Sequence, residues 1–322
     1  MNRAFLWKSL NDAKMLMLAC SAAIFAFAWI RVLIVASMET VRFQKMFDNI
    51  PDIIKRLSPV PVEDLINYPG LVGFTFEEPI AYLMMAVFAI ARGSDSISGE
   101  INRGTMEMML SQPISRRQYL LGHSAVTIFG VAVIALSAFL GTKVGIEPAQ
   151  VDMATQSMTW QLPFGFEVPL GDFKNEPKFK PLKELLDANL FIASAINYFS
   201  LGVFLTGLTT ALSSVDRFRW RTIGLTVSIY VVQTVCELTG LAVSGARWLL
   251  NLTFFSTYEP VGHATQIAKD PNYAWLFFDN KSTGVIPDLG PIGCNTVLLG
   301  LGALGIGFAV VAFTKRDLPA PL

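Results

Sequence analysis

The chain has 322 residues with 25 basic and 25 acidic side chains, so its formal net charge is zero. Apolar residues make up 52 % of the sequence and charged residues only 16 %, below the roughly 25 % usual in soluble domains. This composition excludes an ordinary soluble domain, and the long apolar runs described below identify a membrane protein instead.

The first predicted element is a short amphipathic helix at the N-terminus, over residues 1–15. Phe5 and Leu10 can face lipid while Lys8 and Lys14 face water, which is typical of a helix lying in the membrane interface. A polar extension of the first span would give the same pattern, and the pattern alone does not separate the two.

Six apolar runs approach the length of about 20 residues that a hydrocarbon core requires. The first is too long for the apolar region of a signal peptide and lacks a small-x-small exit, so we interpret it as a retained helix. The second is the shortest. The predicted spans cover about 16–36, 77–92, 119–141, 189–212, 222–243 and 294–313 of one transmembrane domain over residues 1–322.

The charge distribution predicts the orientation of these spans. The N-terminus, the C-terminus and the two short loops on their side carry 12 Lys and Arg against 6 Asp and Glu. Because Lys and Arg gather in cytoplasmic loops, both termini are expected in the cytoplasm. The outer segments, about 37–76, 142–188 and 244–293, are long and contain recurring aromatic residues, which indicates small folded caps.

No motif for catalysis occurs in the sequence. Lys281-Ser282-Thr283 lacks the glycines of a phosphate-binding loop, and the two histidines, His123 and His263, are far apart in the chain. No nucleophile stands beside a base. We therefore expect no catalytic residue, no metal ligand and no cofactor in this chain, and any energy for its work must come from another protein.

A charged segment lies between the second and third spans and has the pattern of a helix over about 94–110. Glu100, Arg103 and Glu107 recur at i, i+3 and i+7, so on such a helix they would share one face and could form ion pairs. An ordinary solvated loop would not need this continuous helical pattern.

The next helix has a clear start signal. Pro113 ends the charged helix, Ser115 is suited to the N-cap position, and Gln118 stands where a capping box needs it. Arg116 and Arg117 fall where lipid phosphates would lie. The two helices together predict a lever, with a short helix parallel to the membrane hinged to a spanning one.

This stretch resembles the signature of the membrane subunits of ABC-2 type transporters. That signature has a glutamate, then Gly-Thr, an apolar run, a proline, a Ser-Arg pair and a leucine-rich start to the third span. The corresponding residues are Glu100, Gly104-Thr105, Met106–Leu110, Pro113, Ser115-Arg116 and Tyr119–Gly122. Six spans with both termini inside also fit this family.

The resemblance implies an all-α, type V exporter-like fold with six transmembrane helices, an interfacial helix, a coupling helix over about 94–110 and sizeable outer segments. It implies an exporter permease that pairs with a second copy or a paralogue in a bacterial inner membrane. Two copies of a separate ABC ATPase would hold ATP and Mg²⁺. By this analogy the residues that transmit force are Glu100, Arg103, Gly104, Thr105 and Glu107. Nothing indicates nucleic acid as a partner, and the sequence does not identify the substrate.

Two ionisable residues, Arg31 and Glu237, lie well inside predicted spans and at a similar expected depth. A charge in hydrocarbon costs at least about 2.5–3.5 kcal/mol on insertion scales, so such residues usually find partners or water. One hypothesis is that they pair, within a subunit or across a dimer. The alternative is that Arg31 reaches the outer headgroups while Glu237 forms hydrogen bonds near Gln233 and Thr234.

Two other function classes remain open from the sequence. An ATP-independent secondary transporter or channel would be expected to contain more polar groups inside the membrane than these two. A membrane anchor or assembly factor would keep a partner interface but show no substrate-stimulated ATP hydrolysis.

Overall fold

The computed structural model describes residues 3–37, 67–111, 113–152, 159–162, 166–169, 179–279 and 289–316. Within them, six helical runs are long and apolar enough to cross a membrane, and they overlap the six predicted spans. The all-α membrane class is thus confirmed. The principal helices of these runs are α1 (Arg3–Ser37), α6 (Pro79–Ser94), α9 (Arg116–Ile146), α11 (Phe191–Val215), α12 (Arg219–Ala242) and α14 (Pro291–Lys315).

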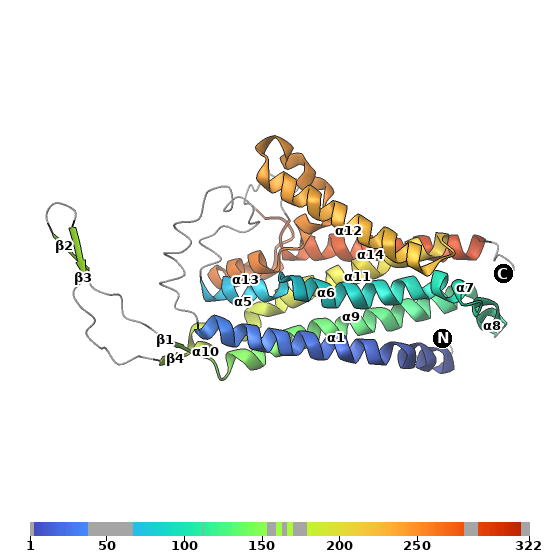
Figure 1. The fold of residues 1–322 in the computed structure, drawn as a ribbon, viewed down its shortest axis with the longest axis horizontal. Helices are drawn as coiled ribbons and strands as arrows, with labels where there is room; N and C mark the ends of the chain where they lie inside the picture. The colour runs from blue at the N-terminus through green and yellow to red at the C-terminus, as the bar shows by residue number, and fades with distance from the viewer. Residues whose placement is uncertain are drawn as a thin grey trace.

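The helices form an elongated bundle (Figure 1). α1 packs mainly on α9, and α11 packs mainly on α14 and α6. The beginning of α1 and the end of α14 lie at one end of the bundle, which also carries α7 (Glu100–Asn102) and α8 (Met106–Leu110). We call this the near end and the opposite one the far end. α12 leans away from the other helices toward the far end (Figure 1).

Glycines allow a close helix contact between α11 and α14. The backbone of Gly207 lies directly against Gly302 and Gly305, where a Cβ added to Gly305 would lie 2.6 Å from the carbonyl carbon of Gly207. Small residues at such crossings let two backbones approach and gain dispersion contacts that larger side chains would prevent. This pair of helices therefore depends on the absence of side chains at the crossing.

The separate interfacial helix expected over residues 1–15 is wrong, because α1 is one helix that begins at Arg3. No glycine or proline interrupts the sequence from Arg3 to Ser37, so nothing favours a break. The first turns also pack on the bundle, since Phe5 is buried with its ring 5.2 Å from that of Tyr119. The structure thus agrees with the alternative, in which the N-terminal residues are a polar extension of the first span.

The far end is built from short elements joined by buried and half-buried polar groups. Asn197 donates from Nδ2 to the carbonyl of Thr257 at 3.1 Å and accepts from the amide of Glu259 at 3.1 Å. Glu77 accepts from the amide of Val261 at 3.0 Å. These elements are α5 (Tyr68–Gly73), η1 (Phe74–Phe76), η3 (Ala188–Leu190), η4 (Ser244–Leu252), η5 (Phe254–Thr257), α13 (Pro260–Lys269) and η6 (Pro271–Trp275).

Two small antiparallel sheets precede α10 (Leu182–Leu185). β1 (Gln150–Asp152) pairs with β4 (Phe179–Pro181), and β2 (Thr159–Leu162) pairs with β3 (Phe166–Pro169). The expected caps over 142–188 and 244–293 thus contain folded elements where the structure describes them. Most of the expected cap over 37–76 lies outside the described residues.

The glycine crossing gives the first prediction. Gly305→Val should destabilise the bundle by about 1–3 kcal/mol, because the new side chain overlaps the backbone of α11. Gly307→Val, two residues further on α14, is the control, since nothing lies within 4 Å of its added Cβ. Thermal unfolding of the purified proteins should show a lower Tm for the first variant alone; equal Tm values would contradict this packing.

Candidate functional site

The site is the segment that leads out of α6 at the near end, residues 94–110. A π-helical turn, η2 (Asp95–Gly99), continues α6 and passes into α7. The chain then turns at Gly104, whose φ is 70°, before α8 begins. The single helix expected over 94–110 is therefore wrong in its middle.

The break has a local cause at Gly104. The amide of Gly104 donates to the carbonyl of Ile101 at 3.0 Å, and the amide of Thr105 donates to that of Glu100 at 3.1 Å. These two bonds make a Schellman motif, which ends a helix and favours glycine at the residue with positive φ. Glycine at this position thus ends the helical run that continues from α6 through α7, and α8 begins as a separate helix.

An ion-pair clasp closes this turn. Arg103 bonds Glu100 at 2.8 Å, as the spacing predicts, and also Asp95 at 2.7 Å. The hydroxyl of Thr105 donates to the other oxygen of Glu100. The Asp95 carboxylate raises the pKa of Arg103, so the guanidinium stays charged. Since exposed ion pairs contribute only about 0–1 kcal/mol each, this clasp mainly fixes geometry.

The short helix α8 has a buried side and an exposed side. Met106 is buried in an apolar cluster with Ile97 and Tyr119. Glu107 and Met108 face outward, and Met108 is 61 % exposed. Glu107 therefore does not share the clasp of Glu100 and Arg103, because the turn at residue 104 rotates α8 relative to α7. The exposed side is available to a partner, while the buried side ties α8 to the spans.

A buried hydroxyl holds the π-helical turn. Ser213 of α11 accepts hydrogen bonds at its Oγ from the amides of Ile97 at 3.3 Å and Ser98 at 2.9 Å. Thr222 of α12 donates its own hydroxyl to Ser98 Oγ at 3.0 Å. A side chain that inserts into a helical ladder is a recognised cause of local distortion, and π-helical turns concentrate at functional sites.

The third span and the fifth also bond this region. Tyr119 of α9 donates its hydroxyl to the carbonyl of Ser96 at 2.9 Å. Arg219, at the start of α12, lies 3.4 Å from Asp95 and donates to the carbonyl of Ala91 at 3.3 Å. Both contacts act on the same turn from different sides.

The first and last spans complete the set. Arg92, at the end of α6, is buried and donates to Ser9 Oγ of α1 at 3.0 Å. Phe313 of α14 is fully buried in the apolar cluster that also holds Ile97. Each of the six spans therefore contacts the near-end segment or the residues that flank it.

Sequence reasoning missed this buried network, although the sequence contained a signal for it. The run Ser94-Asp95-Ser96-Ile97-Ser98-Gly99 places three serines directly after an apolar span, where hydroxyls compete for backbone hydrogen bonds. Ser213 and Thr222 lie at the near ends of two other spans. The sequence does not show that these distant hydroxyls meet.

The capping box at the start of α9 is confirmed. The amide of Gln118 donates to Ser115 Oγ at 3.2 Å, and the amide of Ser115 donates to Gln118 Oε1 at 3.3 Å. Arg116 binds the end of α14. Its Nη1 donates to the carbonyls of Phe313 at 3.0 Å and Arg316 at 2.6 Å, because the end of α14 leaves carbonyls without helical partners.

The expected pairing of Arg31 with Glu237 within one chain is wrong. Arg31 of α1 bonds Glu78, the N-cap residue of α6, at 2.9 Å. Glu237 lies on α12, which leans away from α1 (Figure 1). Glu78 was overlooked because it falls at the edge of a predicted span rather than inside it. Among the described residues, no group of three His, Cys, Asp or Glu side chains could hold a metal ion.

Removal of the buried hydroxyl tests the network. Ser213→Ala should destabilise the protein by about 1–3 kcal/mol, because two buried amides lose their acceptor. Ser214→Ala is the matched control, since that hydroxyl donates only to Ala211 within its own helix. Hydrogen exchange should speed up over residues 95–99 in the first variant alone. Unchanged exchange there would show that the hydroxyl does not hold the turn.

A charge swap tests the pair between α1 and α6. Arg31→Glu and Glu78→Arg should each lower the Tm, because each leaves like charges face to face, and the double variant should regain most of the loss. The swap of Arg31 with Glu237 should give no such rescue. Rescue by the second swap and not the first would restore the original hypothesis.

One comparison with known proteins adds to this geometry. Residues 36–170 match the model of a family described as ABC-2 family transporter protein. The matched range includes α5, α6, the near-end segment and α9, so it contains the residues from Glu100 to Glu107. No curated protein matches the chain.

Proposed function

We propose, on the premise that this chain is a membrane protein of the ABC-2 transporter family, that it is an exporter permease driven by a separate ATPase. The family match supports a multi-pass permease, which is a transport component rather than an enzyme. The observation that carries the proposal is the near-end segment. Each of the six spans contacts it or the residues that flank it, and one side of α8 is still exposed.

In this proposal the ATPase binds the exposed side of α8. Glu107 contributes a charge to the contact, and Met108 contributes apolar area. Met106 transmits a displacement of α8 into the bundle, because its side chain is packed among residues of several spans. Force thus enters through α8 and reaches the spanning helices without passing through a flexible linker.

The clasp and the hydroxyl network distribute this force. Arg103 ties the turn before α8 to Asp95, and Ser213 and Thr222 tie the adjacent residues to α11 and α12. A displacement of α8 therefore moves the near ends of these spans together. A network with two discrete arrangements would convert ATP-driven closure of the partner into reorientation of the spans.

The remaining parts of the assembly follow from the family. The near end would face the cytoplasm, where the excess of Lys and Arg places both termini. Two ATPase subunits would bind two permease chains, either two copies of this one or this one and a paralogue. The ATPases would hold ATP and Mg²⁺, and the permease would lie in a bacterial inner membrane. The direction of transport, export, is inferred from the resemblance to type V exporters.

Purification of the complex from native membranes tests this function. Vanadate-sensitive ATP hydrolysis should co-purify with the chain and fall about tenfold with Met108→Asp, because a charge would be desolvated in the contact. Trp275→Asp at the far end is the control, since Trp275 is 79 % exposed but distant from α8. It should keep the activity.

Two outcomes would contradict the proposal. If the chain purifies without an ATPase under conditions that preserve other complexes, it works as a carrier or an anchor. If the activity co-purifies equally with both variants, the ATPase does not bind at α8.

A further inference from the structure

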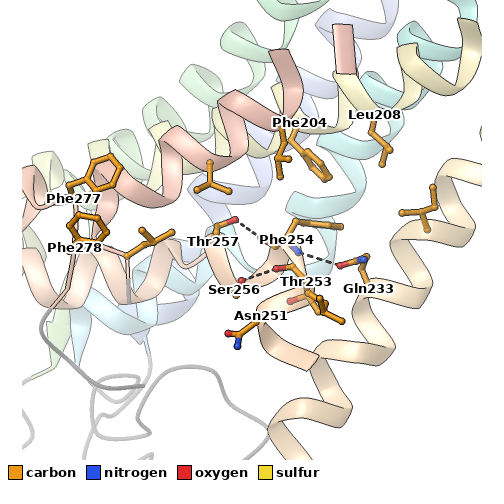
Figure 2. Close-up of a pocket in the computed structure, with 15 residues that line it drawn as sticks. Phe204, Leu208, Gln233, Asn251, Thr253, Phe254, Ser256, Thr257, Phe277 and Phe278 are labelled. Carbon is orange, nitrogen blue, oxygen red and sulfur yellow. Dashed lines mark hydrogen bonds between the residues drawn. The ribbon is translucent and has the colours of Figure 1, made fainter. Parts of the chain in front are cut away.

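A cavity of about 550 Å³ lies between three spans, away from the near-end segment (Figure 2). Phe204 and Leu208 of α11 line it, together with Ile229 of α12 and Leu301 of α14. Its volume is within the roughly 300–1,000 Å³ typical of small-molecule sites. Neither the ion-pair clasp nor the hydroxyl network uses it.

The cavity exists because α12 leans away from α11 and α14 (Figure 1). The chain returns from α12 through η4 and η5, and these two elements close the resulting gap only at the far end. Leu301 is ten residues into α14, or about 15 Å along its axis, whereas Asn251 and Phe278 belong to the far end. The cavity therefore reaches about 15 Å along α14 from the far end, which is half of the roughly 30 Å thickness of a hydrocarbon core.

The chemistry of the lining differs between the elements that supply it. The deep lining from α11 and α14 is apolar, Gln233 of α12 adds an amide, and the segment of η4 and η5 adds uncharged polar groups toward the far end (Figure 2). Gln233 accepts from the amide of Phe254 at 3.3 Å, and Ser256 donates to the carbonyl of Thr253 at 2.8 Å, so the Ser256 oxygen can still accept (Figure 2). Among the described residues that line the cavity, none is charged.

We propose that this cavity binds a lipid-class amphiphile, with one acyl chain in the deep part and an uncharged, hydroxyl-bearing headgroup at the far end. The apolar depth matches an acyl chain, and the polar end offers hydrogen bonds without a charge to pair with a phosphate or an ammonium group. A wholly polar ligand would leave the deep part unmatched.

The surroundings favour a lipid over a soluble ligand. Val297 and Leu301 line the cavity and are also exposed, although they lie on a helix long and apolar enough to span the membrane. Hydrocarbon is the medium that such side chains require, so the cavity opens toward the bilayer beside α14. An acyl chain can then enter sideways without crossing water. This inference goes beyond the proposed transport function and does not depend on it.

Photolabelling tests the site on the intact chain in detergent. The probe is a monoacylglycerol with a diazirine in its acyl chain, which is uncharged and carries two hydroxyls. Labelling should be saturable, compete with unlabelled monoacylglycerol and map by mass spectrometry to peptides containing Phe204, Ile229 or Leu301. Leu301→Trp should reduce it at least fivefold by filling the cavity.

Leu304→Trp is the matched control, because Leu304 lies on the same helix, is 71 % exposed and does not line the cavity. It should leave labelling unchanged. Non-saturable labelling spread over all lipid-facing helices, or equal labelling of the two variants, would overturn the proposal. The proposal would also be overturned if the wild-type chain is a dimer that resists labelling and Leu301→Trp, but not Leu304→Trp, dissociates it. A second copy of the chain would then fill the cavity.

Discussion

The architecture depends on one buried hydroxyl, Ser213, which accepts the amides of Ile97 and Ser98 from another helix. An unpaired buried amide costs about 1–3 kcal/mol, so this contact holds the widened turn in place. Thr222 supports the same turn from α12, and Tyr119 supports it from α9. The near-end segment is therefore held by the same spans that it would move in the proposed function.

In the proposed function, this arrangement would combine rigidity with force transmission. Hydrogen bonds buried in a protein are electrostatically stronger than those in water, so the buried contacts between the spans resist separation. The exposed clasp of Arg103 differs, since water screens it and it adds little stability. We infer that the buried hydroxyls carry the mechanical connection, while the clasp keeps α8 correctly oriented. The cavity is lined by Ile229 and Gln233, near the middle of α12, and this network contacts the first turn of the same helix.

The sequence predicted features set by composition or local spacing. Each of the six apolar runs overlaps a long helical run in the described part of the chain, and the spacing of Glu100 and Arg103 correctly predicted their ion pair. Features that depend on backbone conformation or tertiary approach were missed. The positive φ of Gly104 divides the expected coupling helix, and Glu78 replaces Glu237 as the partner of Arg31. The lean of α12, which opens the cavity, has no local signature because it is set by packing.

The central claim is that the exposed side of α8 is bound by an ATPase. Its most direct test replaces Met108 with a photoreactive amino acid and irradiates native membranes. We predict a crosslinked protein whose peptides include a G-x-x-x-x-G-K-[S/T] phosphate loop, and no such product from the same replacement at Trp275. Crosslinks from Met108 to lipid alone, or to a protein without that loop, would contradict the account.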